Sequence, residues 1–326
     1  MTSAFQETAR HHQIALHRTR PDLFDHTPTG GRFLGKPRDF VLRDGAANLH
    51  PSIRADVLAY FAANRIQWWG GAGPSGHLLS SQIACLNHLY PLRNDALGAR
   101  EALRRLDPGF VEALPVPCDT DSGYIAFEAT SDVDRLNEGT VQRGANNTSL
   151  DAVMLGRRSN GQRVLVAIEW KYTEHYDDTD KSAQGPASAG AQPKGQVRRA
   201  RYDHLIAASG QLRGDVPDDL YREPFYQLMR QTLLLEQLVE HRQTECLGTD
   251  EFLHVHAIPP DNAALLDKAY LPHGLGLEAH WNQVLADPAR YRVIDAHDWL
   301  LGGDGAPIGG PAAAYLAARY WPTAPG

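Results

Sequence analysis

The sequence has few cysteines and no long hydrophobic run. Its three cysteines, Cys85, Cys118 and Cys246, are odd in number and far apart in the 326-residue chain, which argues against a disulfide framework and a zinc-knuckle spacing. We therefore expect reduced, mostly buried thiols. No run of about eighteen apolar residues occurs, and the N-terminus lacks the basic and apolar regions of a signal peptide. We expect a cytoplasmic protein with no membrane partner.

The sequence also has no excess of positive charge. Its net charge is −7, with 22% charged and 42% hydrophobic residues, a composition that is ordinary for a globular protein. The negative charge argues against a protein that holds nucleic acid by bulk electrostatics alone. The segment KGQVRRAR is a local exception, and its basic residues form either a solvated helix face or a phosphate-binding track. These residues are Lys194, Arg198, Arg199 and Arg201.

Several common catalytic motifs are missing. The glycine-rich stretch GGAGPSGH is not a phosphate-binding P-loop, because His77 and Leu78 stand where Lys and Ser or Thr are needed. No serine lies in a nucleophile-elbow pattern. His254 and His256 have a spacing that can hold a metal, but no third ligand accompanies them, so core or surface histidines are favoured.

The order of helix and strand patterns predicts a mixed α/β sheet flanked by helices. We expect residues 51–326 to form one domain, residues 1–50 to form an extension that wraps the surface, and residues near 176–197, rich in Asp, Ala, Gly, Ser and Pro, to form a flexible insertion. The predicted helices span about 51–69, 77–92, 197–209, 224–241 and 277–285, and the predicted strands span 123–130, 149–155, 164–172 and 251–258.

The predicted strand VLVAIEWKY carries two charges near its end. Because side chains alternate across a strand, Glu169 and Lys171 share a face with Leu165, while the opposite face, which includes Trp170, is apolar or aromatic throughout. The mixed face either opens into a polar cleft or simply frays into solvent. The preceding strand favours the cleft, because it begins with Asp151 and adds a second carboxylate. Two carboxylates beside each other are expected where a hard divalent cation binds.

The hairpin between these strands tests that prediction. If Asn160-Gly161 formed a two-residue loop with no bulge, Asp151 would face Trp170, on the wrong side of the sheet. A loop with an odd number of residues, or a bulge, would place Asp151 opposite Glu169 or Lys171. The cation site therefore predicts an irregular hairpin.

Asp151 followed after a hairpin by Glu169-x-Lys171 resembles the signature of the PD-(D/E)xK nuclease superfamily, although Leu150 replaces the usual Pro. The chain is more specifically similar to the uncharacterised bacterial PGN_0703-like branch of that superfamily. The stretches that carry this similarity lie between about residues 51 and 239: PSIRADVLAYFAANRIQWW, HLLSSQIACLNHLYPL, RGANNTSLDAVM, IEWKYTE and PFYQLMRQTLLLEQL.

This resemblance implies a restriction-endonuclease-like αβββαβ core, here with an N-terminal helical extension. It implies that Mg²⁺, for which Mn²⁺ can substitute, binds Asp151, Glu169 and the backbone carbonyl of Trp170. Glu128 is a further candidate ligand, with a surface glutamate as the alternative, and Glu138 is a weaker one. Catalysis would fall to Asp151, Glu169, Lys171 and, on the following helix, Gln227, whose alternative is a solvated helix face. Thr148 and Ser149 are candidates for phosphate contacts.

The function implied is a magnesium-dependent nuclease that hydrolyses phosphodiester bonds of DNA with a metal-activated water, most simply as an endonuclease. Two other classes stay open. One is a catalytically silent nucleic-acid-binding protein of the same fold, and the other is a metal-dependent hydrolase of another phosphate ester. A homodimer would suit an enzyme that cuts both strands, although nothing in the sequence marks a dimer surface.

Overall fold

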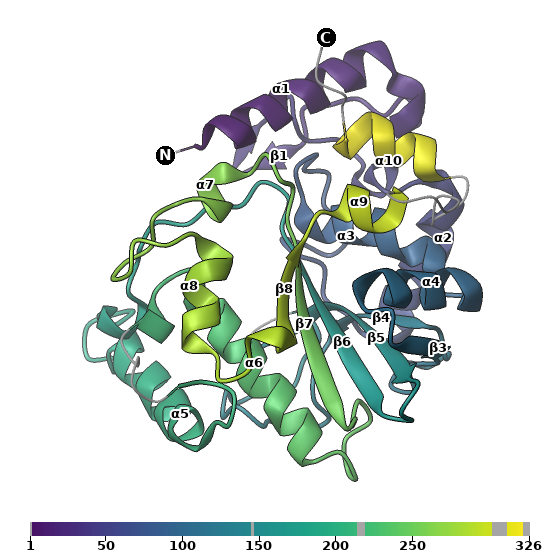
Figure 1. Ribbon diagram of the computed structural model, residues 1–326. Coiled ribbons are helices and arrows are strands. Elements are labelled where there is room, and N and C mark those ends of the chain that lie inside the picture. Colours follow the sequence, from purple (N-terminus) through teal and green to yellow (C-terminus); the bar gives the residue numbers. More distant parts are fainter. Residues whose placement is uncertain (1, 145–146, 214–218, 302–311, 322–326) are drawn as a thin grey trace.

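A six-stranded mixed sheet forms the centre of the computed structural model, which describes residues 2–144, 147–213, 219–301 and 312–321. The strand order is β3-β5-β6-β7-β8, with β4 also paired to β5. β3, β4 and β6 run antiparallel to β5, whereas β6, β7 and β8 are parallel to one another (Figure 1). The strands are β3 (Phe110–Leu114), β4 (Ile125–Ala129), β5 (Leu150–Arg158), β6 (Arg163–Trp170), β7 (Glu251–Ala257) and β8 (Tyr291–Ile294).

Helices cover both faces of this sheet and enclose two hydrophobic cores. The first core lies beneath α2 (Pro51–Ala63), α3 (Ser81–Leu89), α4 (Ala96–Leu106), α9 (Ala296–Leu301) and α10 (Ala313–Tyr320). The second lies beneath α5 (Lys194–Ala208), α6 (Phe225–Glu240), α7 (Ala263–Leu266) and α8 (Leu277–Val284). Figure 1 shows these two groups of helices on opposite sides of the strands. The predicted mixed α/β sheet flanked by helices is confirmed, and the architecture is consistent with a restriction-endonuclease-like fold.

Local sequence explains where the helices near the sheet begin and end. Ser80 accepts a hydrogen bond from the Ile83 N–H and caps α3, while Asp95 caps α4 by accepting the N–H groups of Leu97 and Gly98. α3 ends in a short 3-10 turn that contains Pro91, where the sequence predicts the end of the helix. The structure also contains α4, β3, β8 and α10, which the sequence analysis did not predict.

The remaining elements are short or peripheral. α1 (Ala4–Thr19) packs beside α10, where the buried Gln13 donates to the Tyr172 hydroxyl over 3.2 Å (Figure 1). The proposed division of the chain at residue 50 stays a prediction. Two short strands and six 3-10 turns complete the described chain: β1 (Arg32–Phe33), β2 (Lys36–Pro37), η1 (Pro21–Phe24), η2 (Gly45–Asn48), η3 (Tyr90–Leu92), η4 (Lys181–Ala183), η5 (Asp219–Tyr221) and η6 (Pro288–Arg290).

The hairpin between β5 and β6 is irregular, as the predicted cation site requires. Ala152 pairs with Ile168, and the same register continues to the turn, where the Arg158 N–H donates to the Gln162 carbonyl. Three residues, 159–161, therefore form the loop, with Gly161 at φ +88°, the left-handed position of a three-residue hairpin. This register places Asp151 opposite Glu169.

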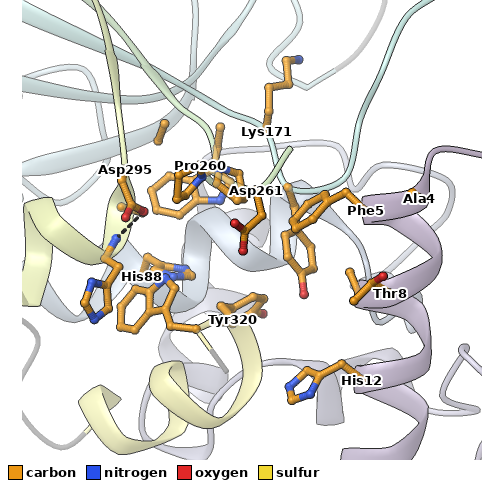
Figure 2. Close-up of a pocket in the computed structure, with 18 residues that line it drawn as sticks. Ala4, Phe5, Thr8, His12, His88, Lys171, Pro260, Asp261, Asp295 and Tyr320 are labelled. Carbon is orange, nitrogen blue, oxygen red and sulfur yellow. Dashed lines mark hydrogen bonds between the residues drawn. The ribbon is translucent and has the colours of Figure 1, made fainter. Parts of the chain in front are cut away.

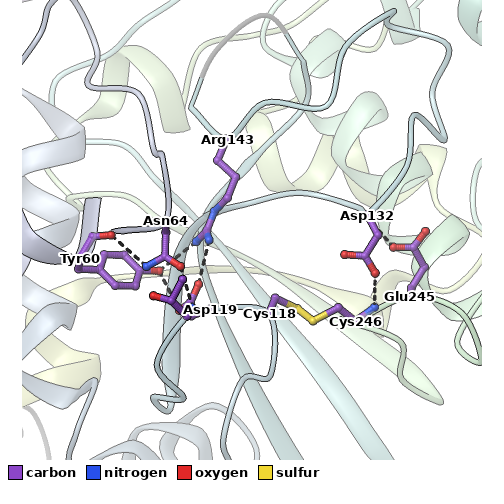
Figure 3. The surroundings of a disulfide bond; sticks show 9 residues. Tyr60, Asn64, Cys118, Asp119, Asp132, Arg143, Glu245 and Cys246 are labelled. Atoms are coloured by element: carbon purple, nitrogen blue, oxygen red, sulfur yellow. Dashed lines mark hydrogen bonds and ion pairs between the residues drawn. A yellow bond between two sulfur atoms is a disulfide. The ribbon is translucent and has the colours of Figure 1, made fainter. Parts of the chain in front are cut away.

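The expectation that all three thiols are reduced was wrong. Cys118 and Cys246 form a disulfide with a Cα–Cα distance of 5.5 Å, and only Cys85 is free and buried (Figure 3). The two partners lie 128 residues apart, in the loops before β4 and before β7. Their proximity is produced by the folding of the sheet, so their spacing in the sequence does not reveal it.

Candidate active site

Three carboxylates occupy matching positions on three neighbouring strands. Phe127 pairs with Ala152, and two residues further along the same register Ala129 pairs with Leu150. Glu128 on β4 lies between these two pairs, opposite Asp151 on β5. Asp151 in turn lies opposite Glu169 on β6. We call Glu128, Asp151 and Glu169 the carboxylate row.

The backbone is unusual at the first two members of this row. Phe127 and Ala129 are two residues apart and should share a face, yet they pack into opposite cores. Glu128 between them has φ +49°, in the left-handed region that side chains other than glycine rarely adopt. β5 also changes face at Asp151, because Leu150 and Ala152 pack into opposite cores. Such strained backbone is concentrated at functional sites, because the surrounding structure must hold it in place.

Asp151 lies where the two central strands separate. The backbone ladder between β5 and β6 extends to Ala152 and Ile168, and beyond it the Trp170 N–H donates to the Asp151 Oδ2 over 2.8 Å. Burial, together with the charges of Glu169 and Glu128, raises the pKa of Asp151 well above its usual range. Trp170 directs its ring into the first core, 4.5 Å from the ring of His88. The large residue at this position therefore stays clear of the carboxylate row, as the sequence predicts.

Glu128 is held by neutral donors from two elements. Gln82 Nε2 of α3 donates to its Oε1 over 2.6 Å, and the Ser149 hydroxyl donates to its Oε2 over 3.1 Å. Glu128 is 8% exposed. Burial raises its pKa, and the charge of Glu169 adds to this effect, while the two hydrogen bonds oppose it. A deprotonated Glu128 is therefore only partly compensated by its neighbours.

Glu169 and Lys171 form a buried ion pair that α6 completes. The Lys171 Nζ lies 2.6 Å from the Glu169 Oε1 and donates to the Gln227 Oε1 over 2.8 Å. Gln227 returns a hydrogen bond of 2.6 Å to Glu169 Oε1, and Gln231 donates to Oε2. Burial lowers the pKa of Lys171, but the negative charges around it, first that of Glu169, outweigh burial and raise that pKa well above its usual range. The ammonium is therefore stable near neutral pH.

The carboxylate row holds more negative charge than its surroundings neutralise. Lys171 is the charged donor to the three acidic side chains, and the side-chain donors Gln82 and Ser149 are neutral. Arg143 donates to the Glu128 carbonyl, and its charge lowers the pKa of Glu128 without cancelling the rise that burial causes. Buried like charges raise one another's pKa because their repulsion is poorly screened. Carboxylate oxygens are the ligands that a hard divalent cation prefers. The donor set therefore fits Mg²⁺ or Mn²⁺.

Several other predicted residues lie outside this row. Thr148 is buried and donates through both its N–H and its hydroxyl to Glu138. Glu138 also pairs with Arg230 at 2.9 Å and accepts the Tyr202 hydroxyl, so it takes part in a different network. The basic residues of α5 make contacts within the second layer: Arg198 donates to the Lys181 carbonyl and to Gln184, Arg199 to Ser182, and Lys194 and Arg201 lie on the same helix.

The structure adds residues that the sequence analysis did not assign to the site. Gln231 follows Gln227 by one helical turn on α6, a spacing that places both on one face and that was available as a signal. Gln82 carries no such signal, because α3 meets β4 only through tertiary packing. His256 on β7 pairs with Glu169 on β6. His254 and His256 are each 2% exposed, which confirms that both are core histidines. Burial lowers the pKa of His254 to about 3.

Comparison with known proteins gives one family. The model of a family described as "Restriction Endonuclease associating with ARP" matches residues 8–321, almost the whole chain. Neither the curated proteins nor the solved structures provide a match. Within the described part of the chain, no helix combines the length and the apolar character that are needed to span a membrane.

Proposed function

The chain belongs to the family of restriction endonucleases associating with ARP, and from that premise we propose that it is a metal-dependent endonuclease that hydrolyses phosphodiester bonds of DNA. Family membership indicates a nuclease. The observation that carries the finer proposal is the carboxylate row, in which Asp151 lies opposite Glu169 and Lys171 pairs with that glutamate over 2.6 Å. This is the arrangement that a PD-(D/E)xK site requires. The family description also names ARP, and we propose that this chain associates with such a partner.

The metal would be held by Asp151 and Glu169, with Glu128 and the Trp170 carbonyl as further oxygen ligands. A bound divalent cation supplies Lewis acidity and lowers the pKa of a coordinated water. Burial and mutual repulsion raise the pKa values of Asp151 and Glu128, and a cation would relieve both effects. The neutral donors Gln82 and Ser149 orient Glu128 and leave its charge in place, which supports a role in cation binding.

Lys171 acts as a fixed positive charge in this proposal. Its raised pKa keeps the side chain protonated near neutral pH, so it is poorly suited to remove a proton from water. A fixed ammonium can instead offset the negative charge that develops on phosphorus during attack. Gln227 bridges Lys171 and Glu169, and it would hold the ammonium in position before DNA binds.

The basic residues of α5 would bind the DNA backbone where it leaves the active site. Arg198 lies 5.5 Å from the ring centre of Tyr226, and Arg230 lies 5.3 Å from the same ring. Tyr226 directly precedes Gln227 on α6, the helix that completes the ion pair. We propose that Lys194, Arg198, Arg199 and Arg201 contact phosphates of bound DNA. Ser149 would contact a phosphate near Glu128.

Cleavage assays test the proposed function directly. Purified protein would be incubated with supercoiled, linear and single-stranded DNA in Mg²⁺, Mn²⁺ or EDTA. We expect cleavage of DNA only with a metal, and nicking or linearisation of the circle if the enzyme is an endonuclease. Lys171→Ala should lose cleavage by about a thousandfold or more, whereas Lys36→Ala, which changes an exposed lysine on β2, should cut normally. DNA binding without metal-dependent cleavage by the wild type would contradict the proposal.

A further inference from the structure

A cavity adjoins Lys171 of the ion pair on the side of the sheet that faces α1. It has a volume of about 600 Å³ and is lined by the ends of β6, β7 and β8 at Trp170, Ala257 and Asp295 (Figure 2). These three strands are parallel, and ligands of open α/β sheets bind where parallel strands end at their carboxyl side. The volume falls within the range of roughly 300–1,000 Å³ that is typical of small-molecule sites.

The walls of this cavity are rich in aromatic rings. His88 is the centre of a cluster in which its ring lies 4.5 Å from Trp170, 4.7 Å from Tyr320 and 5.0 Å from Trp321. α1 forms the facing wall with Phe5 and other side chains. Figure 2 shows the Asp261 side chain reaching into the space between these walls. A cavity that is lined by aromatic side chains suits a flat, aromatic ligand, which packs against the ring edges that the cavity exposes.

The polar groups of the cavity include two carboxylates. Asp261 and Asp295 both line it, and Asp295 is half-buried, so that burial raises its pKa. Lys171 is the only lysine or arginine among the described lining residues, and Figure 2 shows its side chain pointing away from the cavity. Its ammonium contacts Glu169 instead. Two carboxylates with no arginine and no inward-pointing lysine among the described lining residues disfavour a phosphate in this space. They favour a neutral ring that carries N–H donors.

We propose that this cavity binds a nucleobase with an exocyclic amine, as adenine, cytosine and guanine have. Stacking on the aromatic walls would bind the ring, and Asp261 would accept the amine. The base comes either from a free nucleoside or, if the proposed nuclease function holds, from the DNA strand at the site. In the second case the base would be extruded on one side of the Trp170–Lys171 peptide while its phosphate lies on the other, and enzymes that act on extruded bases bind them in a pocket by stacking and hydrogen bonds.

Binding can be measured without any cleavage. Metal-free protein in EDTA would be titrated by calorimetry with deoxyadenosine, deoxycytidine and thymidine, which lacks the exocyclic amine. We expect saturable binding of the first two with a Kd on the order of 1 mM or lower, and binding of thymidine about tenfold weaker. Because no turnover is involved, the result is independent of whether the protein is a nuclease.

Two variants locate the binding to the cavity. Asp261→Ala should weaken deoxyadenosine binding about tenfold, and Thr8→Trp, which fills the cavity from the exposed side of α1, should abolish it. Asp267→Ala is the matched control, because Asp267 is exposed and does not line the cavity. Unchanged binding in Asp261→Ala and Thr8→Trp, or no preference over thymidine, would overturn the proposal.

Competition with DNA identifies the source of the base. If an extruded base occupies the cavity, duplex DNA in EDTA should displace deoxyadenosine from the wild type. If the cavity serves free nucleosides, DNA and deoxyadenosine should bind together. Either outcome supports a nucleobase site, whereas the absence of saturable nucleoside binding contradicts it.

Discussion

Two of the buried carboxylate sites have surroundings that differ sharply, although they meet at adjacent residues, Thr148 and Ser149. Glu138 accepts hydrogen bonds from Thr148, Tyr202 and the guanidinium of Arg230, so its negative charge is fully matched. Ser149, the next residue along the chain, donates instead to Glu128 in the carboxylate row. There, Lys171 is the charged donor to three acidic side chains, and Arg143 contacts only the Glu128 backbone carbonyl. The first site is completed by the protein alone, whereas we propose that a further cation completes the second.

This difference separates a structural use of buried charge from a functional one. A matched buried ion pair is costly to break, because the partner is left charged and unsolvated. An excess of like charge is costly to keep, and the folded protein is more stable when that excess is removed. The comparison therefore predicts opposite signs for similar substitutions at the two sites.

The largest expected effect is on activity at the carboxylate row. Asp151→Asn removes one metal ligand and keeps the acceptor for the Trp170 N–H. We expect cleavage to fall by about a thousandfold or more, because positioning and charge stabilisation fail together. Initial rates of plasmid cleavage at saturating Mg²⁺ measure the effect. Glu138→Gln should retain a far larger share of activity in the same assay at low temperature, and equal losses in both variants would remove the distinction between the sites.

The next effect concerns stability without metal. Glu138→Gln leaves the Arg230 guanidinium without its carboxylate and should lower the free energy of unfolding by about 3 kcal/mol. Asp151→Asn relieves repulsion and should raise it by about 1 kcal/mol in EDTA. Urea unfolding of both variants beside the wild type gives the two signs. A marked loss of stability in Asp151→Asn would mean that the row is balanced without a cation.

The pH dependence of stability sharpens the same comparison. The pKa values of Asp151 and Glu128 are raised in the folded protein, so the folded state binds protons more tightly than the unfolded chain. The stability of the metal-free protein should therefore fall as pH rises from about 4 through the folded-state pKa values, by on the order of 1 kcal/mol. Melting temperatures in EDTA across this range measure the slope. The slope should be smaller in Asp151→Asn, and its persistence there at full size would assign it to other groups.

The smallest effect is expected at the residues that orient the carboxylates. Gln82→Ala removes the 2.6 Å hydrogen bond to Glu128 and leaves every proposed metal ligand in place. We expect a fall in cleavage rate of about tenfold, with partial recovery in Gln82→Asn, since one well-placed hydrogen bond to a charged group contributes roughly 1.5–3 kcal/mol. The apparent affinity for Mg²⁺ in the cleavage assay distinguishes a shifted Glu128 from a general loss of folding, which would lower all activities alike.

The sequence predicted the parts of this site that depend on local pattern. Alternation along β6 placed Glu169 and Lys171 on one face, and the requirement for an odd hairpin loop followed from simple register arithmetic, which the three-residue loop confirms. The helix that carries Gln227 was predicted from its apolar spacing. These features depend on neighbours in sequence or on one strand pair.

The rest depends on contacts between distant segments. The change of face at Glu128 needs a left-handed backbone conformation, which no residue type at this position predicted. The Cys118–Cys246 disulfide joins loops that only the folded sheet brings together. β3 and α4 lie in a segment whose many charged residues are typical of a linker, yet Phe110 and Leu103 are buried. The aromatic cavity is likewise assembled from α1, α3, α10 and three strand ends.

Calorimetric titration of the metal-free protein with Mn²⁺ tests the central claim most directly. That claim is that the carboxylate row is a divalent-cation site and the Glu138 site is not. We predict saturable binding to the wild type, its loss in Asp151→Asn and its retention in Glu138→Gln. Binding that survives in Asp151→Asn, or that disappears in a folded Glu138→Gln variant, would contradict the account.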